Sequence, residues 1–310
     1  MKPLFIILMT TIISCNIFAQ PKSLRNKKDT ITYFAYNNKG EKASFSYDGK
    51  MGIIDSLGKV IIEAKYDFIL NVFEDDGFQY HMAVLNKKDI VLNANGDIII
   101  PPIFDDITPS INGFFKVKKN GRYTFIDTMG LQMSSWFKDT KYFRSKLAPV
   151  KVKNKWGFIN TLGELYIKPK YSKVTVFSET GQAAVKTNGK WGFIDVNNQL
   201  VIPCVYDKVR FFWNELCAVK KNGKWGFINT NGQTIIPFNY EDALYFHCEL
   251  AAVKINGKYG FINKSNEFVI PPIYRKAHTF GKDDQNTMVK KNLFKWIWIN
   301  KKGECVFWCD

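Results

Sequence analysis

Histidine, cysteine and acidic residues are scarce in this 310-residue sequence. It contains 3 His and 6 Cys, which leaves little material for metal or thiol chemistry, and no Cys/His spacing fits a zinc site. Only 28 Asp and Glu stand against 44 Lys and Arg. The net charge of +16 excludes an acidic solvating protein and favours an anionic partner. With 46% hydrophobic and 23% charged residues, the chain has the composition of a globular protein.

Recognisable catalytic motifs are missing as well. The sequence contains no nucleophile elbow, phosphate-binding loop or HExxH helix motif, and no grouped carboxylates at catalytic spacing. Its strongest acidic deviation, Phe73-Glu-Asp-Asp-Gly77, is interpreted as a surface loop. We therefore expect a protein without enzymatic activity, without a cofactor and without a metal site.

Long hydrophobic runs are also lacking, apart from one at the N-terminus. Residues 4–13 are apolar, and small and polar residues follow, which is typical of a secretory signal peptide over residues 1–19. The run is about half as long as the roughly 20 residues that a membrane-spanning helix needs. We expect cleavage after Ala19 and export to the periplasm, the cell surface or the medium. Alternatively, Ile12-Ile13-Ser14-Cys15 resembles a weak bacterial lipobox, and lipidation of Cys15 would make an outer-membrane lipoprotein.

An odd number of cysteines remains after residues 1–19 are removed, which forbids complete intramolecular pairing. In an extended strand, Cys305 and Cys309 would lie about 13 Å apart, beyond disulfide reach unless the chain turns between them. We expect mostly buried free thiols, with one terminal bridge as the alternative. The five cysteines are Cys204, Cys217, Cys248, Cys305 and Cys309.

One heptapeptide recurs in the second half of the sequence. Its copies begin at Asn154, Gly189, Gly223 and Gly257, and their phenylalanines are separated by 35, 34 and 34 residues. A constant period in this range indicates a repeat array and overrides the length-based estimate of about two domains. Weaker copies bring the expected number of units to eight; they span residues 49–55, 87–93, 121–127 and 294–300.

Each unit has the pattern of a three-stranded antiparallel meander. The pair Asn188-Gly189 and its equivalents predict a two-residue hairpin, and a second turn follows the Trp-Gly strand. The third strand ends at a proline such as Pro203, because proline cannot donate to the ladder. The predicted fold class is all-β, with tandem units of about 34 residues.

We favour an open solenoid over a closed propeller-like ring, because propeller blades usually have four strands in about 40 to 45 residues. A fourth strand in the Tyr-Asp-x-Val segment after the proline would favour the ring. The predicted organisation is a signal peptide over 1–19, a basic leader with an N-terminal capping hairpin over 20–42, and the repeat array over 43–310.

The repeated motif residues are interpreted as packing and turn elements. Trp191 and Phe193 share one face of the middle strand, so equivalent rings would stack into a ladder along the array. The alternative of sugar-stacking tryptophans is disfavoured, because Met51 and Tyr259 fill the same position. The glycine is expected to receive the adjacent unit, with a β-bulge as the alternative. The motif residues are Trp156, Gly157, Phe158, Trp191, Gly192, Phe193, Trp225, Gly226, Phe227, Tyr259, Gly260 and Phe261.

An Asn or Asp closes each motif. Asp127, Asn160 and Asp195 occupy this position, where a short polar side chain bonds to nearby backbone amides. Their recurrence is therefore interpreted as structural and not as catalytic.

Lysine also recurs, and alternation with valine points the first-strand lysines to solvent. Aligned along the array, the lysines would form a positive stripe, which is interpreted as a solvated face that blunts edge pairing. The alternative is a surface that attracts an anionic polymer such as acidic polysaccharide, lipopolysaccharide phosphates or nucleic acid, the last disfavoured by export. The lysines are Lys153, Lys186, Lys220 and Lys254 on the first strand, and Lys155, Lys190, Lys224 and Lys258 after the turn.

The Lys-Trp-Gly-Phe-Ile-Asn/Asp core and the following Val-Ile-Pro-x-x-Tyr-Asp segment resemble the WG (KWG) repeat family of bacterial proteins over residues 43–308. The match is close from 154 to 280 and departs at Val91, which replaces Phe, and at Thr124, which replaces Gly. The resemblance implies an exported or surface-associated β-repeat protein with no defined catalytic residues and an interaction role. We expect a scaffold that binds a protein or cell-envelope component through an extended basic surface. The alternative is a carbohydrate-binding module with exposed aromatic rings.

Overall fold

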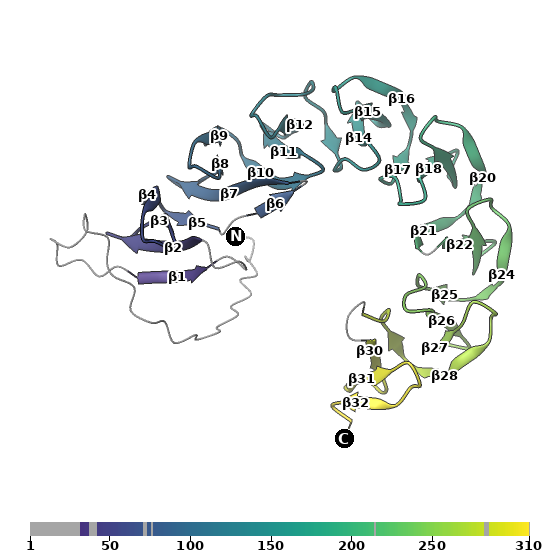
Figure 1. The fold of residues 1–310 in the computed structure, drawn as a ribbon. Coiled ribbons are helices and arrows are strands. Elements are labelled where there is room, and N and C mark those ends of the chain that lie inside the picture. Colours follow the sequence, from purple (N-terminus) through teal and green to yellow (C-terminus); the bar gives the residue numbers. More distant parts are fainter. Residues whose placement is uncertain are drawn as a thin grey trace. The chain divides into compact units, whose positions relative to one another are not determined.

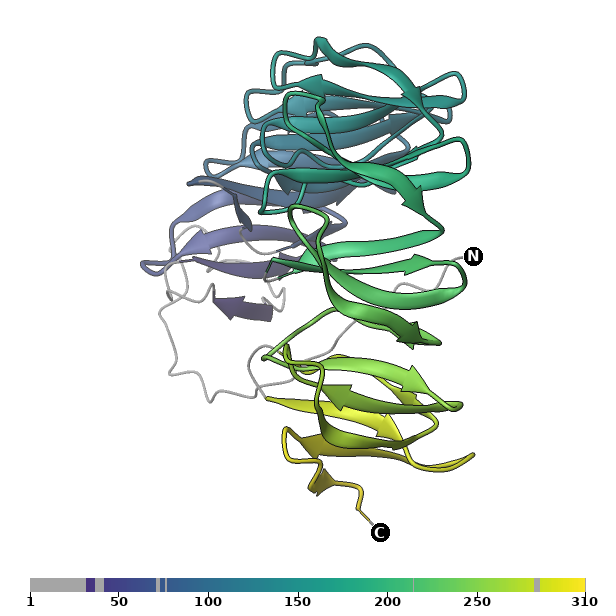
Figure 2. The ribbon, with the colours of Figure 1, turned by 90° about the vertical axis from the view of Figure 1, so that its right-hand side faces the viewer.

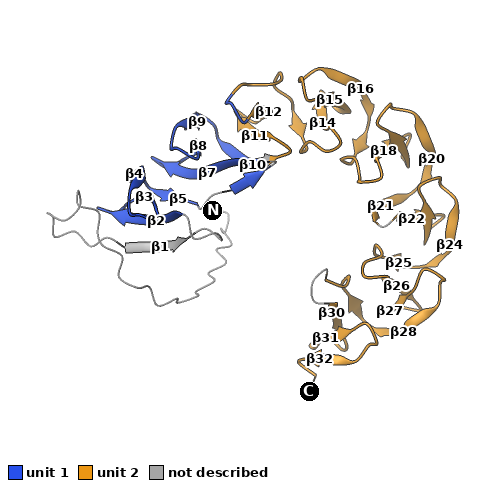
Figure 3. Cartoon of the chain, viewed as in Figure 1, with its two compact units in different colours: residues 1–109, 128–130 blue, residues 110–127, 131–310 orange. Residues whose placement is uncertain are grey.

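The computed structural model describes residues 32–36, 42–70, 73–75, 77–213, 215–281 and 285–309. The predicted signal peptide, with both of its proposed processing sites, and residues 20–31 of the leader lie outside the described residues. All elements of the described part are β-strands, which confirms the all-β class. The chain divides into two compact units, residues 1–109 with 128–130 and residues 110–127 with 131–310 (Figure 3).

The first unit contains two antiparallel sheets. One has the strand order β1-β2-β3-β4, and β1, which lies in the predicted capping hairpin, is its edge strand. The other has the order β5-β7-β8-β9, with β6 paired to β7. The strands are β1 (Thr32–Tyr36), β2 (Lys42–Tyr47), β3 (Lys50–Asp55), β4 (Val60–Tyr66), β5 (Phe68–Ile69), β6 (Phe73–Asp75), β7 (Phe78–Leu85), β8 (Lys88–Asn93) and β9 (Ile98–Ile100).

The sheets of the second unit follow one another in chain order (Figure 1). A three-stranded sheet is made of β10 (Asp106–Ile111), whose residues up to Pro109 belong to the first unit, and of β11 (Phe114–Lys119) and β12 (Arg122–Asp127). The next two sheets have four strands each, and they are made of β13 (Asp139–Thr140), β14 (Leu147–Val152), β15 (Lys155–Asn160) and β16 (Leu165–Tyr171), and of β17 (Lys173–Val174), β18 (Gln182–Thr187), β19 (Lys190–Asp195) and β20 (Leu200–Tyr206).

Three further four-stranded sheets complete the second unit, so the described residues form eight sheets, as the eight sequence copies predict. Each of these ladders in the second unit is linear, with two edge strands. The strands are β21 (Lys208–Trp213), β22 (Leu216–Lys221), β23 (Lys224–Asn229) and β24 (Thr234–Tyr240); β25 (Asp242–Ala243), β26 (Ala251–Ile255), β27 (Lys258–Ile262) and β28 (Phe268–Tyr274); and β29 (Lys276–Ala277), β30 (Asn286–Lys290), β31 (Trp296–Asn300) and β32 (Cys305–Phe307).

In the four-stranded sheets of the second unit the predicted three-stranded meander is present, and a further strand is added before it. The prediction that the third strand ends at the proline is wrong, because β20 continues past Pro203 to Tyr206. Asn188 and Gly189 close the β18–β19 hairpin with φ of 47° and 80°, the conformation that both residues tolerate at low cost. At the second turn, Asp195 Oδ1 accepts hydrogen bonds from the amides of Asn197 and Gln199, which confirms the turn role of the Asx residues. The added strand is the first of each sheet, and in four sheets it has only two residues, as in β17.

The hydrophobic core of the second unit lies between consecutive sheets, which are stacked along the chain (Figure 2). Ala183 and Val185 of β18 pack backward onto the cluster that contains Phe158. Ala184, between them, packs forward onto the cluster that contains Phe212. Both faces of the strand are therefore buried, which explains why its sequence is continuously apolar.

The predicted ladder of motif rings is wrong in its pairing. Each motif phenylalanine packs against a second phenylalanine, nineteen residues further on, that lies beyond the first strand of the next sheet or at its end. The ring centroids are about 5 Å apart at tilted or edge-on angles, a favourable aromatic geometry. The pairs are Phe158–Phe177, Phe193–Phe212, Phe227–Phe246 and Phe261–Phe280.

The motif glycine does not receive the adjacent unit. A Cβ on Gly226 would lie 2.6 Å from the carbonyl oxygen of Ile236, in the third strand of the same sheet. Trp225 pairs with Tyr240 and Phe227 with Ile236, so two residues of β23 span four of β24. The structure thus supports the bulge alternative: the irregular third strand presses against the glycine.

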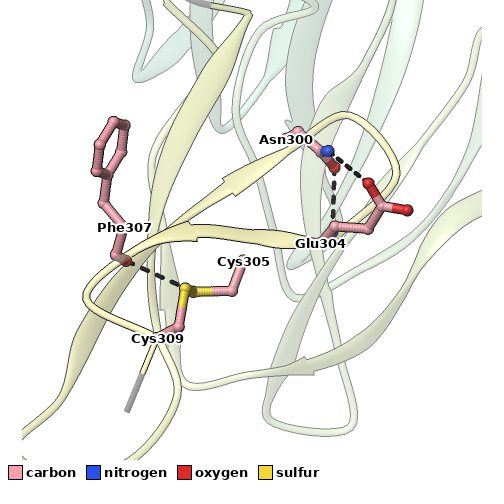
Figure 4. The surroundings of a disulfide bond; sticks show 5 residues. All are labelled: Asn300, Glu304, Cys305, Phe307 and Cys309. Atoms are coloured by element: carbon pink, nitrogen blue, oxygen red, sulfur yellow. Dashed lines mark hydrogen bonds between the residues drawn. A yellow bond between two sulfur atoms is a disulfide. The ribbon is translucent and has the colours of Figure 1, made fainter.

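A disulfide links Cys305 and Cys309 near the end of the chain (Figure 4). Strand β32 ends at Phe307, and Trp308 has a φ of 57°, so the chain turns and brings the two Cα atoms to 5.6 Å. The terminal bridge is therefore present. Of the described thiols, Cys217 is buried, while Cys204 and Cys248 are half-buried and free.

Candidate basic binding face

In the second unit, lysines occupy one fixed position on the long strand that precedes each motif strand. Lys186 pairs in register with Trp191, and its Nζ lies 5.8 Å from the centre of that ring. Lys254 is placed in the same way on Tyr259, also at 5.8 Å. The aromatic ring therefore holds the ammonium group through a cation–π contact. We call these residues the strand lysines; in the second unit they are Lys118, Lys151, Lys186, Lys220, Lys254 and Lys290.

The assignment of Lys153 to the first strand is wrong. Strand β14 ends at Val152, and Lys153 lies in the hairpin turn with a φ of 52°. Its place is taken by Lys151, whose Nζ lies 5.7 Å from the ring centre of Trp156. This copy has Lys153-Asn154 where the others have Asn-Gly, so Lys153 is equivalent to the turn residue Asn188 and the strand lysine lies two residues before it.

A second set of lysines, the turn lysines, begins the motif strand; Lys50 is half-buried and the others are exposed. Lys190 forms an ion pair with Asp207, and Lys50 does so with Asp67 at 2.5 Å. In both pairs the acid is seventeen residues after the lysine and directly follows the buried tyrosine of the third strand. The turn lysines are Lys50, Lys88, Lys155, Lys190, Lys224 and Lys258.

These acids also bond to the hairpin of the following sheet. Asp207 accepts from the amide of Gly223, and Asp67 accepts from the amide of Lys87 at 3.1 Å. Hydrogen bonds from the lysine, and then from the backbone amide, hold the pKa of Asp207 below its usual value. Where the acid is present, it therefore offsets a turn lysine and joins neighbouring sheets.

The strand lysines Lys220 and Lys254 line a concavity of 620 Å³, whose other lining residues come from the same two sheets and the sheet before them. Arg210 donates to Asp242 Oδ1 at 3.1 Å, and Tyr259 donates to Asp242 Oδ2 at 2.6 Å. Burial and the hydrogen bond to this carboxylate raise the pKa of Tyr259. Its lining mixes both charges; the charged members are Lys208, Arg210, Lys220, Lys254, Glu241 and Asp242.

A second concavity of 490 Å³ lies beside the first and shares Lys254 with it. Its other lining residues come from the last two sheets and the segments next to them. Because both concavities contain Lys254, the basic face is continuous from Lys220 to Lys290. The lining residues are Lys254, Gly257, Lys258, Arg275, Lys276, Lys290 and Leu293.

The structure thus brings together only part of the predicted lysine set. Lys220, Lys254 and Lys258 line the two concavities, whereas Lys155, Lys190 and Lys224 lie outside their linings. The residues that sequence reasoning missed are Arg210, Arg275, Lys276 and Lys290, together with the acids Asp207, Glu241 and Asp242. The seventeen-residue spacing between turn lysine and acid is the signal that could have located Asp207, Glu241 and Arg275.

The motif tryptophans offer little free ring surface. Trp156 is 7% exposed and Trp225 is 6% exposed, and Trp191 is half-buried. The Trp225 ring is also covered by Arg210, whose guanidinium carbon lies 5.0 Å from the ring centre. Sugar-stacking platforms need open ring faces, so these rings favour the packing interpretation.

No metal site or membrane-spanning helix accompanies this face in the described part of the chain. No group of three or more His, Cys, Asp or Glu side chains within the described ranges is placed to hold a metal ion. Nor do those ranges include a helix with the length and apolar character needed to cross a bilayer.

Solved structures with a similar course of the chain have low sequence identity. A eukaryotic initiation factor matches with 13% identity and a TM-score of 0.49, covering 80% of this chain and 78% of that one. The dihydro-heme d1 dehydrogenase NirN matches with 10% identity and a TM-score of 0.41, covering 94% and 76%. PorZ, a surface component of the type-IX secretion system of Porphyromonas gingivalis, matches with 9% identity and a TM-score of 0.35, covering 76% and 37%. All three TM-scores are below 0.5.

The sequence comparison is decisive for the family. No curated protein matches the chain significantly. The model of the WG-containing repeat, in contrast, matches six times and covers more than half of the chain. The matched segments are residues 51–80, 91–123, 156–191, 191–225, 225–259 and 259–292. The chain therefore belongs to the family of proteins built from WG-containing repeats.

Proposed function

We propose that this protein is an exported, non-catalytic repeat scaffold that binds an anionic component of the cell envelope, or an acidic protein surface, through its strand and turn lysines. The observation that carries the proposal is the placement of a strand lysine at the same position of successive sheets, with two adjoining concavities that share Lys254. A positive surface that repeats at a fixed spacing suits a polymer whose charges also repeat.

Export is supported by two independent features. The N-terminal apolar run has the length and flanking residues of a signal peptide. The Cys305–Cys309 disulfide fits an oxidising compartment, since disulfides persist mainly outside the cytosol.

Heparin chromatography with a matched pair of variants tests the proposal. The first variant replaces strand lysines by glutamine at Lys151, Lys186 and Lys220. The control makes the same replacement at Lys168, Lys264 and Lys302, which lie on the third strand or at the second turn. We expect the first variant to elute at clearly lower salt than the control, because it removes three aligned charges from the binding face. Equal elution of both variants, or no retention of the unmodified protein at low salt, would contradict the proposal.

A further inference from the structure

In one repeat, an arginine replaces the acid that lies seventeen residues after the turn lysine. Asp207 and Glu241 hold the acid position in two successive repeats, and Arg275 holds it in the next. The turn lysine seventeen residues before Arg275 is Lys258, so a cation stands where the repeat normally supplies the neutralising carboxylate. Both residues are exposed, and both line the 490 Å³ concavity, which we call the basic pocket.

The basic pocket concentrates positive charge without an acid in its lining. Five of its seven lining residues are cationic, and the other two are Gly257 and Leu293. The neighbouring concavity differs, because Glu241 and Asp242 line it and offset its cations. Of the five pocket cations, Lys254 has an acidic partner, Glu241, at 3.8 Å across a half-exposed pair. Such a loose, solvated pair leaves most of the lysine charge available to a ligand.

The size and chemistry of the pocket indicate its ligand. A volume of 490 Å³ falls within the roughly 300–1,000 Å³ typical of small-molecule sites. The planar guanidinium of Arg275 can bond two oxygens of one phosphate, while the lysines act as point charges around it. A single carboxylate would neutralise only one of five cations, whereas each phosphate monoester carries about −1.5 to −2 charges at neutral pH.

We propose that the basic pocket is a specific site for a ligand that carries two or more phosphate groups, an inference that rests on the proposed function and narrows it to one place on the face. Arg275 and Lys258 bind the phosphates directly, and Lys276 and Lys290 complete the shell. The strand and turn lysines then attract anions in general, and the basic pocket selects those that carry two or more phosphate groups.

Calorimetric titration of the full chain with tripolyphosphate tests this assignment. Arg275→Asp removes the guanidinium and restores the carboxylate that pairs with the turn lysine in other repeats. The control is Lys168→Asp, which changes the net charge equally on the third strand of another sheet, outside the pocket. We expect Arg275→Asp to weaken binding at least about tenfold, and the control to change it less than about twofold. Arg275→Gln, which adds no new charge, should give a smaller loss in the same direction, and thermal melting checks that each variant is folded.

The outcomes separate this inference from the proposed function. Equal weakening by both Asp variants, or no tripolyphosphate binding by a protein that still binds heparin, would overturn the phosphate site in the basic pocket. Either result would leave the proposed anion binding by the strand and turn lysines standing. Failure of both ligands to bind would overturn both. Sedimentation with phosphatidylcholine vesicles that contain phosphatidylinositol bisphosphate identifies the source: pelleting that Arg275→Asp abolishes supports a lipid headgroup, and binding in solution without pelleting supports a soluble ligand.

Discussion

The rings of Phe227 and Phe246 lie 4.9 Å apart at an angle of 58°, and both side chains are fully buried. Phe227 belongs to the motif strand of one sheet, and Phe246 lies beyond the first strand of the next sheet. The pair therefore joins two repeats, and it belongs to the cluster that fills the space between them. Equivalent pairs recur through the second unit, so the stability of this array depends on contacts between sheets.

Replacing Phe246 by alanine should therefore destabilise the protein by about 3–5 kcal/mol, because it opens a cavity between two sheets. Urea unfolding followed by tyrosine and tryptophan fluorescence measures the change. Phe211→Ala is the matched control, because that ring is 54% exposed, and it should cost far less. A similar loss for both variants would show that burial between sheets is not the origin of the effect.

Gly226→Ala should destabilise the protein by about 1–3 kcal/mol, since the added methyl group meets the backbone of β24. Gly281→Ala serves as the control, because its Cβ would have only an ordinary contact, 3.7 Å from the carbonyl oxygen of Asn286. Thermal or urea unfolding of the two variants makes the comparison. A neutral Gly226→Ala would mean that the third strand does not press against the motif glycine.

Stability should fall in acid because of His81. This side chain is fully buried in the first unit, and burial, with the positive charge of Lys42 nearby, lowers its pKa from 6.5 to about 4. The histidine is therefore neutral when folded and takes up a proton more readily when unfolded. Its contribution is constant above pH 6.5, and on the order of 3 kcal/mol is lost as the pH falls from 6.5 to 4.

The His81→Leu variant isolates this effect from the other groups that titrate in acid. The unfolding free energy is measured in urea between pH 4 and pH 7.5 for both proteins. The unfolding free energy of the His81→Leu variant, taken relative to that of the unmodified protein, should rise as the pH falls from 6.5 to 4. Parallel curves would contradict the buried neutral histidine.

The cysteines should react according to their burial. Alkylation of the native protein, followed by mass spectrometry without reduction, should recover Cys305 and Cys309 as a linked pair. Cys217 should stay unmodified until the protein is denatured, because it is buried and burial raises its thiol pKa. Cys204 and Cys248 are half-buried and should react faster. Fast labelling of Cys217 in the native state would contradict its placement between sheets.

Much of this fold can be predicted from the sequence, because the determinants are local. The Asn188-Gly189 turn and the Asp195 turn each depend on a few adjacent residues, and both have the predicted geometry. The short strand Lys173–Val174 lies in the Tyr-Asp-x-Val segment, where the sequence leaves a fourth strand only as an alternative, since two residues are too few to show alternation. Only pairing with β18 makes it visible.

The candidate site was harder to predict, because it depends on which repeats meet. Lys186 and Lys254 lie on the first strand as predicted, whereas Lys153 lies in the hairpin turn because it is equivalent to Asn188 of the next copy. Arg275 takes the Asp position of the Val-Ile-Pro-x-x-Tyr-Asp segment, and Lys276 follows it, so neither residue belongs to the lysine pattern of the repeat. Their importance follows from lying across a concavity from Lys258, which no single repeat reveals.

The salt dependence of heparin binding tests the central claim most directly. Dissociation constants for a labelled heparin fragment are measured from 50 to 300 mM salt for the unmodified protein and for the Lys151, Lys186 and Lys220 glutamine variant. We predict that the logarithm of affinity falls linearly with the logarithm of salt concentration, and that the variant has a shallower slope because fewer counterions are released. Identical slopes for the two proteins, or an affinity that does not depend on salt, would contradict a binding face built from these lysines.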